Sequence, residues 1–193
     1  MRGLVWQRLG EHGMRVIAGA FKGRNLKSPP SMQVRPTSDR LRETLFNVIA
    51  GRVPESRFLD LCAGSGAVGI EALSRGAAHA TFVDRSRKSC QLIESNLDLC
   101  RVPEEQRDIY CAEVVEFVKQ NPSNPWDLIF LDPPYKEDYT RLLEVLGSAR
   151  VLNDNGLLIV EHHHKTQLPE TTGNLRRTRV LKQGDSALTF YLC

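Results

Sequence analysis

The sequence predicts an α/β protein in which a mostly parallel sheet of seven strands carries helices on both faces and ends in an antiparallel hairpin. Three observations predict this fold class. Strand-length apolar runs alternate with helix-length segments from Arg57 onward. Glycines mark the junction after the first of these strands, at Gly64-Ser65-Gly66. The last two apolar runs flank Gly184-Asp185, which is typical of a hairpin.

The elements are expected in a regular order. A short hairpin is expected over 16–28, and Thr37 or Ser38 can cap a helix to about Ala50, because apolar residues recur at helical spacing over 41–49. After it we expect strands at 58–62, 80–83, 109–111, 127–131, 157–160, 175–182 and 187–192, and helices at 68–75, 87–99, up to 118 and at 139–147. Parallel sheets of this kind bind ligands at the carboxyl ends of their strands.

A chain of 193 residues is enough for one domain with a sizeable core. We expect a single domain over 14–193, made of a basic hairpin and helix (14–50) and an α/β core (51–193). Residues 1–13 lack the strand-like pattern that begins at Met14. They are expected to be a disordered arm or an extension, with Met14 as the alternative start.

The composition of the chain excludes several classes of protein. A hydrophobic content of 41% with 25% charged residues is ordinary for a globular protein, and no apolar run is long enough for a membrane span. The five cysteines form no C-x-x-C pair, so we expect reduced thiols in a cytoplasmic protein and no zinc site. In Glu161-His162-His163-His164, strand alternation would let only His162 and His164 converge, so no metal site is expected there either.

The charge is uneven although the net charge is only +3. Residues 15–42 contain one acid, Asp39, and seven basic residues: Arg15, Lys22, Arg24, Lys27, Arg35, Arg40 and Arg42. We call these seven basic residues the basic front. A basic front on an otherwise mildly acidic protein indicates a polyanionic partner. The alternative is a solvated hairpin and helix without a partner. Arg176, Arg177 and Arg179 are most simply interpreted as a solvated strand face.

The glycine loop fits two cofactors. Gly64, Gly66 and Gly69 form a G-x-G-x-x-G pattern, and Asp84 at the end of the next strand can accept both ribose hydroxyls, as in dinucleotide-binding proteins. Asp60, four residues before the first glycine, would however repel a pyrophosphate and suits the ammonium and sulfonium of S-adenosylmethionine. This charge favours S-adenosylmethionine over NAD.

A second motif, Asp132-Pro133-Pro134-Tyr135, directly follows the apolar strand 127–131. The prolines stiffen the backbone and cannot donate hydrogen bonds, which leaves carbonyl oxygens facing outward. A carboxylate, free carbonyls and an aromatic ring together can hold a planar group that bears an NH2. Such a cradle suits methyl transfer to the exocyclic amine of a nucleobase and has no role in hydride transfer.

With these motifs the chain resembles the class I S-adenosylmethionine-dependent methyltransferases and, more narrowly, the bacterial 16S ribosomal RNA (guanine(966)-N(2))-methyltransferase family. The resemblance covers nearly everything from Met14 to Leu192. Besides the two motifs above, it is carried by Arg15-Val16-Ile17-Ala18-Gly19, Lys22-Gly23-Arg24, Arg35-Pro36-Thr37-Ser38-Asp39-Arg40, Arg42-Glu43-Thr44-Leu45-Phe46-Asn47, Phe58-Leu59-Asp60-Leu61 and Gly184-Asp185-Ser186-Ala187-Leu188.

The resemblance implies a Rossmann-like fold and methylation of guanine N2 in 16S ribosomal RNA at guanine 966. It implies cofactor contacts from Asp60, Gly64, Gly66, Asp84 and Ala112 or Glu113, and catalytic roles for Asp132, Pro133 and Tyr135. The substrate is expected to be a folded or protein-bound ribosomal RNA, contacted by Lys22, Arg24, Lys27, Arg35 and Arg40. A cytoplasmic monomer without membrane or metal partners is expected.

Two other functions remain open at this point. The cradle also suits the N6 amine of adenine, although the chain has no separate target-recognition domain. A non-catalytic RNA-binding module with a vestigial cofactor pocket is the alternative of another class, against which the acids Asp60, Asp84 and Asp132 count.

Overall fold

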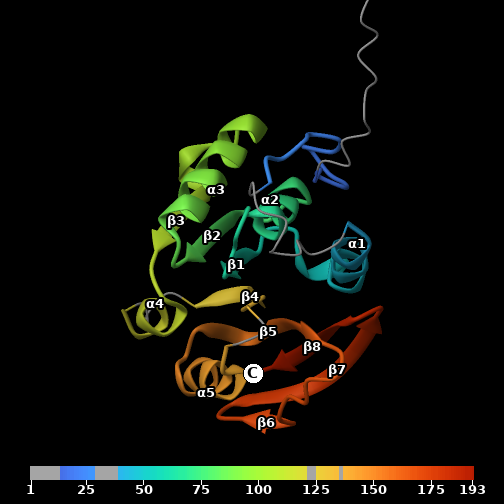
Figure 1. Cartoon of the computed structure of the whole chain (residues 1–193), viewed down its shortest axis with the longest axis vertical. Coiled ribbons are helices and arrows are strands. Elements are labelled where there is room, and N and C mark those ends of the chain that lie inside the picture. Colours follow the sequence, from blue (N-terminus) through green and yellow to red (C-terminus); the bar gives the residue numbers. More distant parts are fainter. Residues whose placement is uncertain (1–13, 29–38, 121–124, 135–136) are drawn as a thin grey trace, which may run out of the picture.

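The computed structural model describes residues 14–28, 39–120, 125–134 and 137–193 (Figure 1). Segment 1–13, and with it the expectation of a disordered arm or an alternative start, lies outside the described residues. So do the expected helix caps Thr37 and Ser38.

One sheet of eight strands organises the molecule, in the order β3-β2-β1-β4-β5-β8-β7-β6. The strands β1 to β5 pair in parallel, and β8, β7 and β6 continue the sheet in antiparallel pairing. Their bounds are β1 (Arg57–Leu61), β2 (His79–Asp84), β3 (Arg107–Cys111), β4 (Trp126–Leu131), β5 (Leu152–His163), β6 (Thr171–Thr172), β7 (Leu175–Gln183) and β8 (Ser186–Leu192). The predicted fold class is confirmed. The predicted count of seven strands is one too low, because β6 has only two residues and shows no periodicity.

Helices cover both faces of this sheet, as Figure 1 shows. Their bounds are α1 (Asp39–Val48), the 3-10 turn η1 (Ala50–Arg52), α2 (Ala67–Ser74), α3 (Arg87–Cys100), the 3-10 turn η2 (Glu104–Gln106), α4 (Val114–Gln120) and α5 (Tyr139–Ser148). One apolar core joins α1, α2 and α3 to the sheet, and a second joins α4 and α5 to its other face. No described helix combines the length and the apolar character needed to cross a bilayer.

Glycine permits the close packing of α2 on the sheet. A Cβ atom at Gly69 would lie 2.3 Å from the Cε1 atom of Phe82 on β2, a distance that side chains do not tolerate. Gly69, the third glycine of the G-x-G-x-x-G pattern, therefore serves the packing of α2 on the sheet. This contact places the first turn of α2, and the loop before it, directly over the ends of β1 and β2.

The predicted N-terminal hairpin is present, with backbone hydrogen bonds of its own and further contacts to the helices of the core. Arg15 and Asn25 form an isolated antiparallel bridge, and the amide of Gly23 donates to the carbonyl of Val16 at 2.9 Å. Most of its other anchors lie on α2 and α3. We call residues 14–28 the N-terminal strap, because residues 17–21 are bonded to α2 and residues 24–27 to α3.

Candidate active site

A cavity of about 1080 Å³ opens at the carboxyl ends of the parallel strands. Its walls include the loop after β1, the end of β2, the start of α4 and the segment after β4. The two predicted motifs therefore meet in one cavity, with Asp60, Gly64, Asp84, Glu113 and Asp132 among its lining residues. Its size suits a cofactor together with part of a substrate.

The loop between β1 and α2 turns through a series of left-handed residues. Cys62, Gly64 and Gly66 have φ angles of 61°, 56° and 76°. Gly64 lines the cavity, whereas a Cβ at Gly66 would lie 3.3 Å from Ile93, so Gly66 serves the turn and the packing beneath it. The left-handed conformation at Cys62 has no signal in the sequence, since non-glycine residues rarely adopt it.

Asp60 lies beneath this loop and is buried. Its Oδ2 atom accepts a hydrogen bond from the backbone amide of Gly69 at 2.9 Å, which ties the end of β1 to the first turn of α2. Burial raises the pKa of the Asp60 carboxyl to about 8, in spite of this hydrogen bond. The sequence suggested an ionised carboxylate near the mouth of the loop; the structure instead places a largely protonated carboxyl in the floor of the cavity.

Asp84 at the end of β2 is held by two backbone amides. Its Oδ2 atom accepts from Gly64 at 2.9 Å, and its Oδ1 atom accepts from Ser86 at 2.8 Å. Each carboxylate oxygen keeps a further lone pair for a ligand hydroxyl. The Asp84 carbonyl accepts from the amide of Ala112 at 3.1 Å, which brings the predicted adenine-side residues Ala112 and Glu113 next to it.

Asp132 follows β4, the strand that pairs with β1 on the side away from β2. Its amide donates to the carbonyl of Leu61 at 3.3 Å, so the segment after β4 is bonded to the residue where the glycine loop begins. Neighbouring strands lie about 5 Å apart, which makes the two motifs direct neighbours. The buried Pro133 has its carbonyl 3.5 Å from the Tyr139 hydroxyl. Tyr135 lies outside the described residues.

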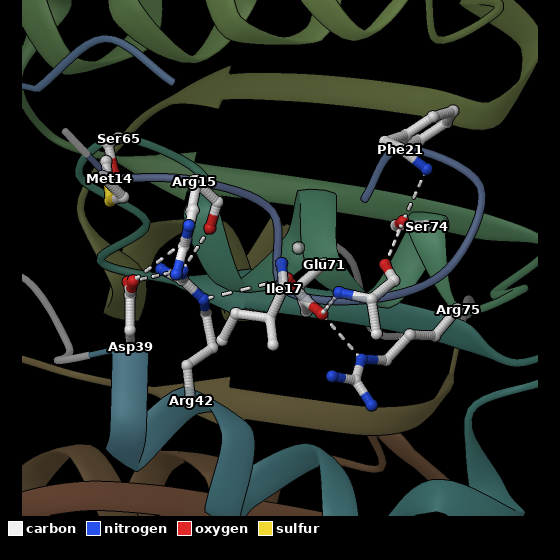
Figure 2. Close-up of polar contacts among 12 residues, drawn as sticks. Met14, Arg15, Ile17, Phe21, Asp39, Arg42, Ser65, Glu71, Ser74 and Arg75 are labelled. Atoms are coloured by element: carbon white, nitrogen blue, oxygen red, sulfur yellow. Dashed lines mark hydrogen bonds and ion pairs between the residues drawn. The ribbon is translucent and has the colours of Figure 1, made fainter. Parts of the chain in front are cut away.

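The N-terminal strap completes the wall of the cavity, which the sequence did not predict. Met14 lines the cavity, and the Ser65 hydroxyl lies 3.5 Å from its sulfur atom. Figure 2 shows how Glu71 on α2 holds the strap: its carboxylate accepts from the amides of Ile17 at 2.7 Å and Ala18 at 3.0 Å. In the sequence, Glu71 is the one charged residue of α2, which indicates a polar contact there but does not identify its partner.

Arg42 on α1 joins the same buried network (Figure 2). Its Nη2 atom donates to the carbonyl of Arg15 and to the Oδ1 atom of Asp39, and its Nε atom lies 3.9 Å from Glu71. Burial lowers the pKa of this guanidinium, and the acids Asp39 and Glu71 partly offset that effect. Arg42, counted in the basic front, is therefore a structural residue.

The family model described as "Conserved hypothetical protein 95" matches residues 14–192. This chain belongs to that family. It is 36% identical over 186 residues to "Ribosomal RNA small subunit methyltransferase D" of Escherichia coli, covering 94% of this chain and 91% of the relative. It is 40% identical to "Putative rRNA methyltransferase YlbH" of Bacillus subtilis, over 92% of this chain and 98% of the relative.

Among solved structures, this chain is similar to "Putative methyltransferase yhhF from Escherichia coli". Its TM-score is 0.82 at 33% identity, with 93% of this chain and 97% of that chain covered. The predicted Rossmann-like methyltransferase fold and family are thus confirmed. Since the family model begins at residue 14, its match includes the strap that forms part of the cavity wall.

The basic front of this family member is less uniform than its sequence indicates. Arg24 donates to the carbonyl of Leu99 near the C-terminal end of α3, and the Lys27 ammonium donates to the Ser95 hydroxyl at 2.6 Å. Arg15, Lys22 and Arg40 instead line a second cavity of about 410 Å³, together with Asp39 and Glu43. Arg35 lies outside the described residues.

The histidine run is arranged differently from the expectation. His162 is buried and its Nε2 atom bonds to the Thr189 hydroxyl at 2.7 Å. Because β5 ends at His163, strand alternation does not extend to His164, and the prediction that His162 and His164 are the pair able to converge is wrong. Among described residues, His163, His164 and Asp185 instead bring donor atoms within 4.8 Å of one another.

Proposed function

We propose that this protein transfers a methyl group from S-adenosylmethionine to the exocyclic N2 of a guanine in 16S ribosomal RNA, at guanine 966. One observation carries the proposal: the Asp132-Pro133 segment lies beside the glycine loop and opens into the same cavity. A small-subunit ribosomal RNA methyltransferase D relative at 36% identity supports the choice of substrate. The base position and the N2 specificity rest on the family resemblance.

The cavity residues fit this cofactor. Asp60 and the backbone at Gly64 would hold its methionine end, and Gly66 would support the turn from below. Asp84 would bind the ribose hydroxyls, and Ala112 and Glu113 would lie at the adenine. A carboxyl whose pKa is about 8 ionises readily when a cation lies against it, which suits the ammonium group of the cofactor.

The remaining chemistry belongs to the segment after β4. When bound, the cofactor supplies an electrophilic methyl group. The Asp132 carboxylate and the Pro133 carbonyl would accept hydrogen bonds from the two N–H groups of the guanine N2 amine. These bonds would direct the lone pair of N2 out of the plane of the ring. Asp132 would then accept the proton that leaves the methylated nitrogen, and Tyr135 would stack on the base. Orientation and charge placement are the catalytic contributions of these residues.

A base inside a helix cannot enter such a cavity, so the target guanine must be unpaired or flipped out. We propose a folded or protein-bound small-subunit RNA as the substrate, with the protein acting as a monomer that uses no metal. Because ribosomal subunits assemble in the bacterial cytoplasm, that is where the activity would take place.

The test uses small subunits from a bacterial strain that lacks the corresponding enzyme. We expect the protein, with labelled S-adenosylmethionine, to methylate one guanine, and nuclease digestion with mass spectrometry would identify N2-methylguanine and its position. Label in N6-methyladenine instead would favour the adenine alternative. Absence of label together with no binding of S-adenosylhomocysteine in calorimetry would favour a vestigial pocket.

A further inference from the structure

The strand β7 has an open side. It pairs with β8 along its length, but with β6 only at Thr172↔Leu175 and Thr171↔Arg176. Within the described part of the chain, no strand covers its outer side from Thr178 to Gln183. Figure 1 shows β7 outside β8, with only the short β6 beyond it. Such an edge offers backbone and side chains to a partner.

Three exposed cations occupy this strand: Arg176, Arg179 and Lys182. None of them forms a salt bridge with a residue that the structure describes, whereas their neighbour Arg177 is paired with Glu170 at 2.8 Å. At about 3.3 Å per residue, the three side chains extend over about 20 Å. Arg176 and Arg179 lie on the face of the sheet that also holds Leu192 and Phe190, whereas Lys182 lies on the other face with Ala187. The open edge of β7 therefore has exposed cations on both faces, in agreement with the solvated strand face that the sequence indicates.

The register of the sheet places the last of these cations, Lys182, near the active site. Lys182 pairs with Ala187 on β8, and Ala187 pairs with His162 on β5. The residue before His162 is Glu161, which lines the cavity and accepts a hydrogen bond from the Ser186 hydroxyl at 3.3 Å. Two strand spacings, about 10 Å, thus separate Lys182 from β5 at the level of the cavity.

Two cations of the N-terminal strap, Arg24 and Lys27, are already held by other contacts. Arg24 is bonded to the carbonyl of Leu99, one residue before the end of α3, and this helix runs away from the cavity toward the amino ends of the parallel strands. Lys27 is bonded to Ser95. An RNA strand whose base enters the cavity must pass close to the cavity rim, where β7 offers cations without such contacts.

We infer that the open edge of β7 binds the phosphates of the RNA strand that flanks the target nucleotide. Arg179 would reach the phosphates from one face of the sheet and Lys182 from the other, with Arg176 farther along the strand. This inference rests on the proposed function. Charge favours RNA over a protein strand added to the open edge, because such a strand would use the backbone of β7 and not its cations.

The test compares two double variants with the full-length wild type. Arg179→Gln with Lys182→Gln removes two charges from β7. Arg101→Gln with Arg150→Gln removes the same charge from exposed positions after α3 and α5, near the amino ends of the parallel strands and away from the cavity. Fluorescence anisotropy would measure affinity for a labelled 16S ribosomal RNA transcript and for assembled small subunits over a range of salt concentrations, and calorimetry would measure S-adenosylhomocysteine binding.

For the β7 variant we expect affinity for both RNA forms to fall roughly 3- to 10-fold at about 0.1 M salt and the slope of log K against log salt to decrease by about 1.4. Cofactor affinity should not change. If the β7 variant and the control have equal slopes of log K against log salt, the inference is wrong. Methylation of RNA by the wild type would in that case still support the proposed function. A loss confined to assembled subunits would point to a protein partner and also overturn the inference. If the wild type neither binds nor methylates RNA, the proposed function itself fails.

Discussion

Cofactor affinity should depend on pH through Asp60. Its carboxyl is buried, has a pKa of about 8, and lies in the cavity floor where the ammonium group of the cofactor is proposed to bind. The bound form needs the ionised carboxylate, whereas the free protein holds the proton below about pH 8. Binding must therefore release a proton, and affinity should rise with pH up to about 8.

The magnitude depends on the ionised fraction of Asp60 in the free protein. This fraction is about one half at pH 8 and about 1% at pH 6, so the dissociation constant should be roughly 50-fold larger at pH 6 than at pH 8. Titration calorimetry with S-adenosylhomocysteine at pH 6, 7 and 8, in buffers of different ionisation enthalpy, would measure both the affinity and the proton release.

Asp60→Asn is the matched variant, since its amide oxygen can still accept the hydrogen bond from Gly69. The variant should bind S-adenosylhomocysteine weakly at every pH, and its dissociation constant should not depend on pH. The native state holds a proton that the unfolded chain loses from about pH 4, so Asp60 lowers the stability of the wild type as pH rises from 4 to 8. The variant should then melt at the same temperature as the wild type or higher at pH 8. A flat dissociation constant between pH 6 and 8 in the wild type would refute this reasoning.

Three further predictions concern single positions. Asp132→Ala should retain S-adenosylhomocysteine affinity and lose methyl transfer by at least about 100-fold; wild-type turnover would exclude the proposed role. Glu71→Ala removes the acceptor of two strap amides and should cost about 3–5 kcal/mol of stability in urea unfolding, while the exposed Glu43→Ala on α1 should cost less than about 0.5 kcal/mol; equal costs would contradict the buried network. Gly69→Ala should destabilise the protein by about 1–3 kcal/mol through its contact with Phe82, and an unchanged melting temperature would count against that packing.

The order and type of the core elements could be predicted because each is marked by local features of the sequence. Apolar runs mark β1, β2, β4 and β5, and the glycines between Cys62 and Gly69 mark the turn that every ligand-binding loop of this kind needs. Both motifs could be assigned to one edge of the sheet since parallel strands end on the same side. The pKa of Asp60 could not be predicted, because it depends on burial by residues distant in the sequence.

The attachment of the N-terminal strap could not be predicted for a different reason. Its cations are the visible feature of the sequence and suggest an independent basic arm, whereas its attachment depends on buried polar residues elsewhere. Glu71 lies 54 positions from Ile17, and no local pattern connects them. A buried glutamate in α2 is informative only once the strap is known to bring unpaired amides to it.

Asn96 shows that the strap and the glycine loop form one unit. Its side-chain amide donates to the carbonyls of Ser65 at 2.9 Å and Lys27 at 3.1 Å, and its oxygen accepts from the amide of Lys27 at 2.8 Å. With Met14 at the cavity wall, the two ends of the strap are thereby fixed to the loop proposed to hold the cofactor. Displacing the strap would leave buried donors and acceptors unpaired in both segments, at about 1–3 kcal/mol for each group. The strap is therefore part of the proposed cofactor site, and any contact between the strap and RNA would be made from a position that this site already fixes.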